Sequence, residues 1–204
     1  MIEAIFFDYD GVLTLDGTGS LTTNRFLSER TGIPYDQVRR AFERHNRALN
    51  LGEVDYAGIW PTVCADLGRQ LPLGLLVAAF ESTPVNEPMM RLARDLSGRF
   101  AVGIITDNKK ERIDHLKKYQ QLAEVFAPIV VSSDVGCGKE DPCLFRWALD
   151  RSGVEAGRSV FIDNTRANLV TAAALGINVV HFDDERNDVA ALARTLERDF
   201  GVSP

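Results

Sequence analysis

The chain has 204 residues, of which 45% are hydrophobic and 25% charged, a composition typical of a folded domain and unlike that of disordered or fibrous proteins. Its 23 basic and 29 acidic side chains give a formal net charge of -6, which argues against a nucleic-acid partner. No apolar run approaches the roughly 18 residues that span a bilayer and no basic leader is evident, so we expect a cytoplasmic protein without a membrane partner.

The first predicted element is a strand over residues 4–7, a short apolar run that ends at Asp8. About 90 residues separate it from the next such run, whereas a simple crossover between parallel strands needs roughly 30. The intervening residues show helical periodicity interrupted by glycine and proline, which predicts an inserted helical lobe. Its expected helices cover residues 23–30, 35–49, 55–67 and 73–80, and a helix over 89–96 leads back to the core.

After the insert, apolar runs alternate with segments of helical periodicity. The runs are apolar on both faces, as expected for strands of a parallel sheet, and they cover residues 100–105, 126–131, 159–162 and 177–182. The predicted helices cover residues 109–122, 141–152, 165–175 and 184–200. This alternation predicts an α/β fold, a Rossmann-like three-layer core with a parallel sheet. We assign residues 1–15 and 88–204 to the core, and residues 16–87 to a small α-helical cap domain inserted after the first strand.

Polar residues follow the predicted strands at the edge where open α/β sheets bind ligands. They are Asp8, Asp10, Thr106, Lys139 and Asp163. One residue separates Asp8 from Asp10, so both carboxyl groups can project into one pocket where the strand ends. Displacement at a phosphate ester needs a nucleophile, a proton donor and cations, and this set of side chains can supply them.

Four motifs, in this order, resemble those of the haloacid dehalogenase superfamily, in its phosphatase branch with a helical cap. They are DYDGVLT from Asp8, Thr106 in GIITDN, Lys139 in GCGKEDPCLF, and the acidic FIDNTRANL ahead of an alanine-rich segment. The resemblance covers the whole chain. The sugar-phosphatase and epoxide-hydrolase-like phosphatase subgroups are the most similar.

The resemblance implies a role for each motif residue. Asp8 would be the nucleophile that forms an aspartyl-phosphate, and Asp10 would protonate the leaving oxygen and later accept a proton from water. Thr106, the backbone N–H of Asp107 and the charge of Lys139 would bind the phosphoryl oxygens.

A magnesium cofactor is also implied, because Mg²⁺ prefers oxygen ligands and would offset the carboxylates around a phosphate. The resemblance assigns it the Asp8 carboxylate, the Asp10 backbone carbonyl and a fourth-motif residue. The family usually has two acids there, the second of which contacts the metal, whereas this chain has Asp163 followed by Asn164. Either Asn164 binds the metal, more weakly than an acid would, or Asp163 turns into the site and takes the ligand position itself. Asn168 matches a later asparagine of the family. It would either tether groups next to the metal site or be an ordinary residue in the first turn of a helix.

Two further features concern the surroundings of this site. Four residues near the end of a predicted cap helix would reach the leaving group or lie on a solvated helix face, namely His45, Asn46, Arg47 and Asn50, of which His45 and Arg47 are the candidate substrate contacts. The three cysteines, Cys64, Cys137 and Cys143, lack zinc-ligand spacing, and an odd count is a poor basis for a disulfide framework. We therefore expect a reducing compartment, with Cys137 as an inert loop thiol.

The sequence thus favours a Mg²⁺-dependent phosphatase acting on a small phosphorylated metabolite, such as a sugar phosphate. A phosphosugar mutase is an alternative, because it shares the four motifs. A binding or regulatory protein of the same fold with weakened catalysis is another, and Asn164 is its motivation. The presence of Asp10 disfavours a haloacid dehalogenase, and the long insert disfavours a phospho-acceptor signalling domain.

Overall fold

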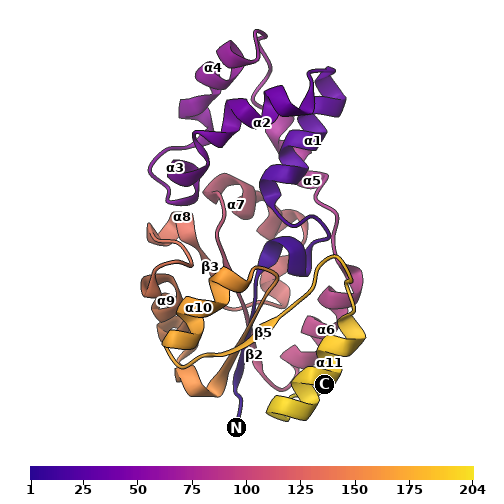
Figure 1. Ribbon diagram of the computed structural model, residues 1–204, viewed down its shortest axis with the longest axis vertical. Helices are drawn as coiled ribbons and strands as arrows, with labels where there is room; N and C mark the ends of the chain where they lie inside the picture. The colour runs from indigo at the N-terminus through magenta and orange to yellow at the C-terminus, as the bar shows by residue number, and fades with distance from the viewer.

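A computed structural model describes all 204 residues and joins five strands in one parallel sheet, in the order β3-β2-β1-β4-β5 (Figure 1). Every residue of the central strand β1 is buried, which explains why its sequence is apolar throughout. The expected α/β fold with a parallel sheet is confirmed. The strands are β1 (Ala4–Phe7), β2 (Ala101–Thr106), β3 (Ile129–Val131), β4 (Ser159–Asp163) and β5 (Asn178–His181).

Side chains alternate between the two faces of the sheet, and each face has its own buried cluster. Ile5 and Phe7 belong to a cluster of 38 residues with α6, α7 and α11, whereas Ala4 and Phe6 belong to a cluster of 11 residues with α9 and α10. These helices form the outer layers of the core. They are α6 (Glu87–Ser97), α7 (Lys110–Tyr119), α9 (Pro142–Ser152), α10 (Arg166–Ala174) and α11 (Val189–Phe200).

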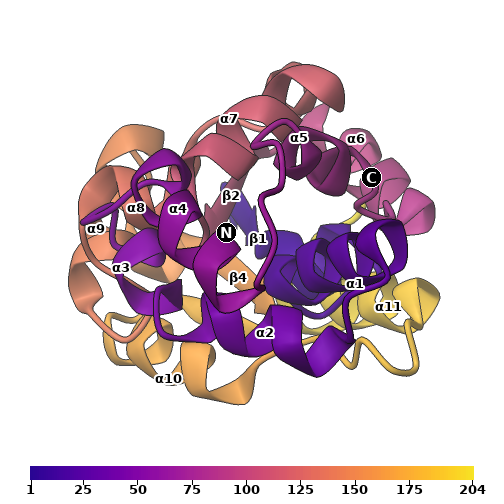
Figure 2. The same cartoon turned by 90° about the horizontal axis from the view of Figure 1, so that it is seen from above.

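The helical cap is the insert between β1 and α6, and it lies beyond the carboxyl ends of the strands (Figure 1). Viewed from above, its helices surround the end of β1 (Figure 2). The larger buried cluster continues from the core into the cap, where it includes Leu27, Phe42 and Trp60. The cap helices are α1 (Gly19–Thr31), α2 (Tyr35–Glu43), α3 (Asn46–Asn50), α4 (Tyr56–Asp66) and α5 (Leu75–Glu81).

Several helix boundaries differ from the prediction. A single helix over residues 35–49 is wrong, because α2 ends at Glu43 and α3 begins at Asn46. Helix α1 begins earlier than predicted because the Thr18 side chain caps it, and α11 begins later because Asp188 caps it. Four short elements escape prediction: η1 (Tyr9–Leu13), α8 (Ser132–Val135), η2 (Leu122–Glu124) and η3 (Ala156–Arg158). No helix has both the length and the apolar character needed to cross a membrane.

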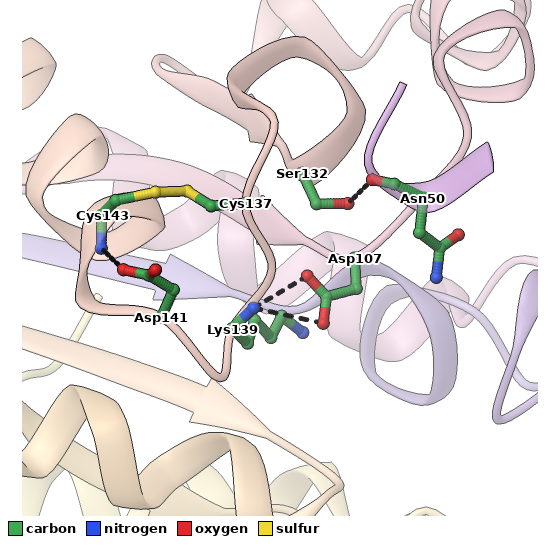
Figure 3. The surroundings of a disulfide bond; sticks show 7 residues. All are labelled: Asn50, Asp107, Ser132, Cys137, Lys139, Asp141 and Cys143. Carbon is green, nitrogen blue, oxygen red and sulfur yellow. Dashed lines mark hydrogen bonds between the residues drawn. A yellow bond between two sulfur atoms is a disulfide. The ribbon is translucent and has the colours of Figure 1, made fainter. Parts of the chain in front are cut away.

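The cysteine prediction requires correction, because Cys137 and Cys143 form a disulfide and only the buried Cys64 is free (Figure 3). The loop that carries Lys139 returns to the start of α9, where Asp141 accepts a hydrogen bond from the Cys143 backbone N–H. This turn brings the two Cα atoms to 6.5 Å, within the usual range for a disulfide. The odd count misled because the third cysteine lies in the cap, away from this loop.

Candidate active site

A cavity of about 340 Å³ lies where the carboxyl ends of the strands meet the cap, and none of its 15 lining residues is hydrophobic. Six of the predicted site residues line it together: Asp8, Asp10, Thr106, Asp107, Lys139 and Asn164. The sheet register explains part of this grouping. Phe7 pairs with Ile104 and Ile162, so the residues that follow these three positions emerge at one edge.

Asp8 and Lys139 form the buried centre of the cavity. Lys139 Nζ lies 2.7 Å from Asp8 Oδ1 and 2.7 Å from Asp163 Oδ2. Asp8 Oδ1 also accepts a hydrogen bond from the Tyr9 backbone N–H, whereas Asp8 Oδ2 has no protein partner. Burial raises the pKa of Asp8, and the charge of Lys139 opposes that shift. Burial disfavours the charge on Lys139, but the Asp8 and Asp163 carboxylates raise its pKa above the usual range.

Asp163 and Asn164 play different structural parts. Both Asp163 oxygens are occupied by donors, namely Lys139 Nζ, the Thr165 backbone N–H and the Asn168 side-chain amide. Asp163 is therefore held by protein donors and does not line the cavity, and Asn168 tethers it. Asn164 instead lines the cavity.

Gly11 explains how the fourth motif comes so close to the first. It adopts a left-handed conformation with φ of 76°, and a Cβ at this position would lie 2.2 Å from Asn164 Nδ2. The same amide nitrogen donates to Asp184 Oδ2 at 3.1 Å. A glycine is therefore required after Asp10 both for the turn and for this approach.

Asp107 shapes the loop that carries Lys139. Its carboxylate accepts hydrogen bonds from the Lys139 backbone N–H at 3.0 and 3.3 Å (Figure 3). Burial raises the pKa of Asp107. The neighbouring Thr106 hydroxyl accepts a hydrogen bond from the Asn108 side chain. Asp107 thus holds the third motif in place through its side chain, a contact that sequence reasoning missed.

Asp10 is held by two residues of the segment after β2. The Arg112 guanidinium donates from Nη2 to Asp10 Oδ1 at 2.8 Å and from Nη1 to Asp10 Oδ2 at 2.9 Å. Asn108 Nδ2 donates to the same Oδ2 at 2.7 Å. Sequence reasoning missed both residues. The only feature of the sequence that could have identified them is that they follow Thr106 closely, in the run TDNKKER.

The cap side of the cavity is also polar. Lys109 Nζ donates to Ser20 Oγ at 2.9 Å, and Ser20 Oγ donates to Asn46 Oδ1 at 3.3 Å, which connects the core to α1 and α3. Burial, together with the nearby charge of Arg112, lowers the pKa of Lys109 to about 8. Lys109 and Ser20 were not expected from the sequence.

Of the four cap residues that the sequence places within reach of the leaving group, His45 and Arg47 do not line this cavity. His45 Nε2 accepts a hydrogen bond from Arg44 Nε. Arg47 is exposed and lies 3.6 Å from Glu140 Oε1. The neighbouring Asn46 and Asn50, on the same helix, line the cavity instead.

The donor set bears on which metal this site would accept. No group of three or more His, Cys, Asp and Glu side chains is arranged to hold a metal ion. The oxygens available at the cavity include those of the Asp8 carboxylate and of the Asn164 side chain. An all-oxygen set with few charges fits Mg²⁺, which keeps several waters, better than zinc, which favours nitrogen and sulfur.

The profile of a hydrolase family described as haloacid dehalogenase-like hydrolase matches residues 2–194. Among curated proteins, bifunctional epoxide hydrolase 2 of Sus scrofa is 27% identical over 224 residues, covering 98% of this chain and 39% of its own length. The chain thus spans well under half of that relative. A phosphoglycolate phosphatase of Rhodospirillum rubrum is 26% identical over 215 residues, covering 94% of this chain and 85% of the relative.

A solved structure has the same fold. It is a HAD family enzyme from Bacteroides thetaiotaomicron in complex with magnesium and inorganic phosphate, and it superposes with a TM-score of 0.72 at 18% identity. The match covers 89% of this chain and 94% of the other.

Proposed function

Since this chain belongs to the haloacid dehalogenase-like hydrolase family, we propose that it is a Mg²⁺-dependent phosphatase that hydrolyses a small phosphorylated metabolite through an aspartyl-phosphate on Asp8. The observation that carries the proposal is the free Asp8 Oδ2, which lies in a wholly polar cavity beside the charged Lys139. A buried carboxylate with one free oxygen and an adjacent cation suits attack on an anionic phosphorus centre.

The reaction divides into two steps that use the same side chains. Asp8 Oδ2 forms a bond to phosphorus while the bond between phosphorus and the leaving oxygen breaks. The leaving oxygen keeps the electron pair of the broken bond and accepts a proton from Asp10. Water then attacks the aspartyl-phosphate, gives a proton to Asp10, and releases inorganic phosphate and the free Asp8 carboxylate. Lys139 and the Thr106 hydroxyl orient the phosphoryl oxygens.

Mg²⁺ would be held by the Asp8 carboxylate, the Asp10 backbone carbonyl and the Asn164 side-chain oxygen. When bound, it supplies the positive charge that brings a phosphate dianion next to carboxylates. Both Asp163 oxygens are occupied by protein donors, and this supports Asn164 as the fourth-motif ligand.

The proposed substrate is small and polar. The cavity volume of about 340 Å³ and its lack of hydrophobic lining support a metabolite rather than a macromolecule. The relative named phosphoglycolate phosphatase and the structural neighbour bound to magnesium and inorganic phosphate support phosphate ester chemistry.

A screen of phosphorylated metabolites with Mg²⁺, read as released inorganic phosphate, tests this proposal. We expect release from at least one small ester, and loss of turnover by 1000-fold or more, on the order expected for a lost nucleophile, in Asp8→Asn. That variant should keep its far-UV circular dichroism. Product analysis that found an isomerised phosphoester and no free phosphate would favour the mutase instead. Full activity of Asp8→Asn would rule out the proposed intermediate.

A further inference from the structure

We propose that Arg112 is a positioning residue that fixes the Asp10 carboxylate and couples it to both chain segments that connect the core to the cap. The inference rests on the proposed function, because it assigns Asp10 to proton transfer. Helix α7, which carries Arg112, lies directly beneath the cap (Figure 1).

The contact between Arg112 and Asp10 is a buried two-point ion pair. Arg112 is fully buried, and the Asp10 side chain is only 10% exposed. The two guanidinium nitrogens bind one Asp10 oxygen each, at 2.8 and 2.9 Å, so the plane of the carboxylate is fixed as well as its distance. A single cation such as lysine would hold the carboxylate without fixing this plane. The geometry therefore orients Asp10 in the cavity that it lines.

Asn108 completes this arrangement. Its side-chain nitrogen donates to Asp10 Oδ2, and its side-chain oxygen accepts from Arg112 Nη1 at 3.0 Å. The three side chains thus form a closed triangle of hydrogen bonds. A proton donor that must reach a leaving oxygen loses most of its effect on the rate when it is misplaced by about 1 Å. By holding Asp10 in place, the triangle therefore supports the rate of proton transfer.

Arg112 also contacts the two segments between core and cap. On the outgoing segment, Gly19 packs directly on the guanidinium, since a Cβ at Gly19 would lie 2.4 Å from Arg112 Cζ. On the returning segment, Thr83 Oγ1 accepts a hydrogen bond from Arg112 Nη2 at 3.2 Å. The Arg112 guanidinium also lies over the Tyr9 ring, whose centroid is 5.5 Å from Arg112 Cζ. A change in cap position therefore moves the group that orients Asp10.

The ratio of kcat/KM between two esters provides the test. An alkyl phosphate needs a proton on its poor leaving oxygen, whereas an activated aryl phosphate does not. We expect Arg112→Gln to lower kcat/KM about 10-fold or more for the alkyl ester and less than about 3-fold for the aryl ester, with partial recovery in Arg112→Lys. In the background of Asp10→Asn, Arg112→Gln should have no further effect on the alkyl ester, because it acts through Asp10.

Gly19→Ala tests the connection to the cap without removing a charge. Gly19 does not require a left-handed conformation, so alanine suits the first turn of α1, and the atoms nearest to its methyl group are those of the guanidinium. We expect the same ester-dependent loss as for Arg112→Gln. The matched control is Gly74→Ala, because a Cβ at Gly74 meets no atom within 4 Å, and this variant should match the wild type.

The outcomes separate this inference from the proposed function. Equal losses for both esters, or losses that multiply in the Asp10→Asn background, would mean that Arg112 only stabilises the fold, and the inference would be wrong. A wild-type ratio in Gly19→Ala would refute the connection to the cap. Absence of phosphate release from either ester by the wild type would overturn the proposed function and this inference with it.

Discussion

Lys109 is a buried cation that faces the cavity without a carboxylate partner. Its ammonium group contacts the Ser20 hydroxyl, and burial lowers its pKa to about 8, well below that of an exposed lysine. The side chain is therefore charged below pH 8 and neutral above it. An anionic substrate that contacts Lys109 loses a charge-assisted hydrogen bond as the pH rises through this value.

We expect KM for the phosphate ester to rise about 10-fold between about pH 7 and about pH 9.5, the equivalent of ~1.4 kcal/mol. The phosphate itself is already a dianion at the start of this range, so its ionisation does not contribute. Lys109→Gln should have a raised KM that no longer depends on pH. The adjacent Lys110 is exposed, and Lys110→Gln should keep the wild-type profile. A constant KM in the wild type would mean that Lys109 does not contact the substrate.

Sequence patterns can identify site residues that lie at the ends of strands. They miss residues that reach the cavity only through the packing of the folded chain. Asp8, Thr106 and Lys139 could be found because Asp8 follows β1 directly, Thr106 ends β2, and Lys139 lies in a loop at the ligand-binding edge. Arg112 could not, because it lies within a charged run on α7 whose burial depends on how the cap packs above it. The sequence named Asn46 together with His45, and only the break after α2 decides that Asn46 lines the cavity and His45 does not.

The loop between α8 and α9 is bridged by the disulfide between Cys137 and Cys143. The disulfide closes a loop with a sequence separation of 6 around Lys139, and such a loop stabilises a fold by about 2 kcal/mol in the chain-entropy model. We expect Cys143→Ser to lower the free energy of unfolding by about that amount, as measured by urea denaturation.

Alkylation of the unfolded chain checks the cross-link itself. Without reductant, mass spectrometry should find one alkylated cysteine, Cys64, and with reductant it should find three. Three alkylated cysteines without reductant would show that the loop is held without the cross-link, by its hydrogen bonds and by the ion pairs of Lys139.

Strands and helices of the core were easier to locate than their ends. Burial on both faces makes the central strand β1 an apolar run, and β1 begins and ends where the sequence predicts. Helix ends depend on single capping contacts, such as Thr18 before α1, which compete with neighbouring polar residues in the sequence. The short turn η1, which carries Asp10, has no periodicity that could reveal it.

At the scale of the whole molecule, the cap and the core share one apolar cluster. A chain of aromatic contacts runs from Phe42 through Tyr56 and Phe80 to His115 on α7, with ring centroids 6.3, 5.6 and 6.5 Å apart. The same buried cluster of 38 residues includes β1 and the cap helices. If either the cap or the core unfolded alone, apolar surface of the other would become exposed to water. This favours a single cooperative unfolding transition.

Two tryptophans make this prediction measurable, because Trp60 is buried in the cap and Trp147 lies partly exposed on α9. In Trp147→Phe, the fluorescence of Trp60 reports on the cap alone, while far-UV circular dichroism reports on the whole chain. We expect both signals to change at the same urea concentration and with the same steepness. An earlier fluorescence transition would mean that the cap unfolds independently, so that the shared cluster contributes little. Coincident transitions would mean that the cap and the core unfold as one unit, held together by the buried cluster that they share.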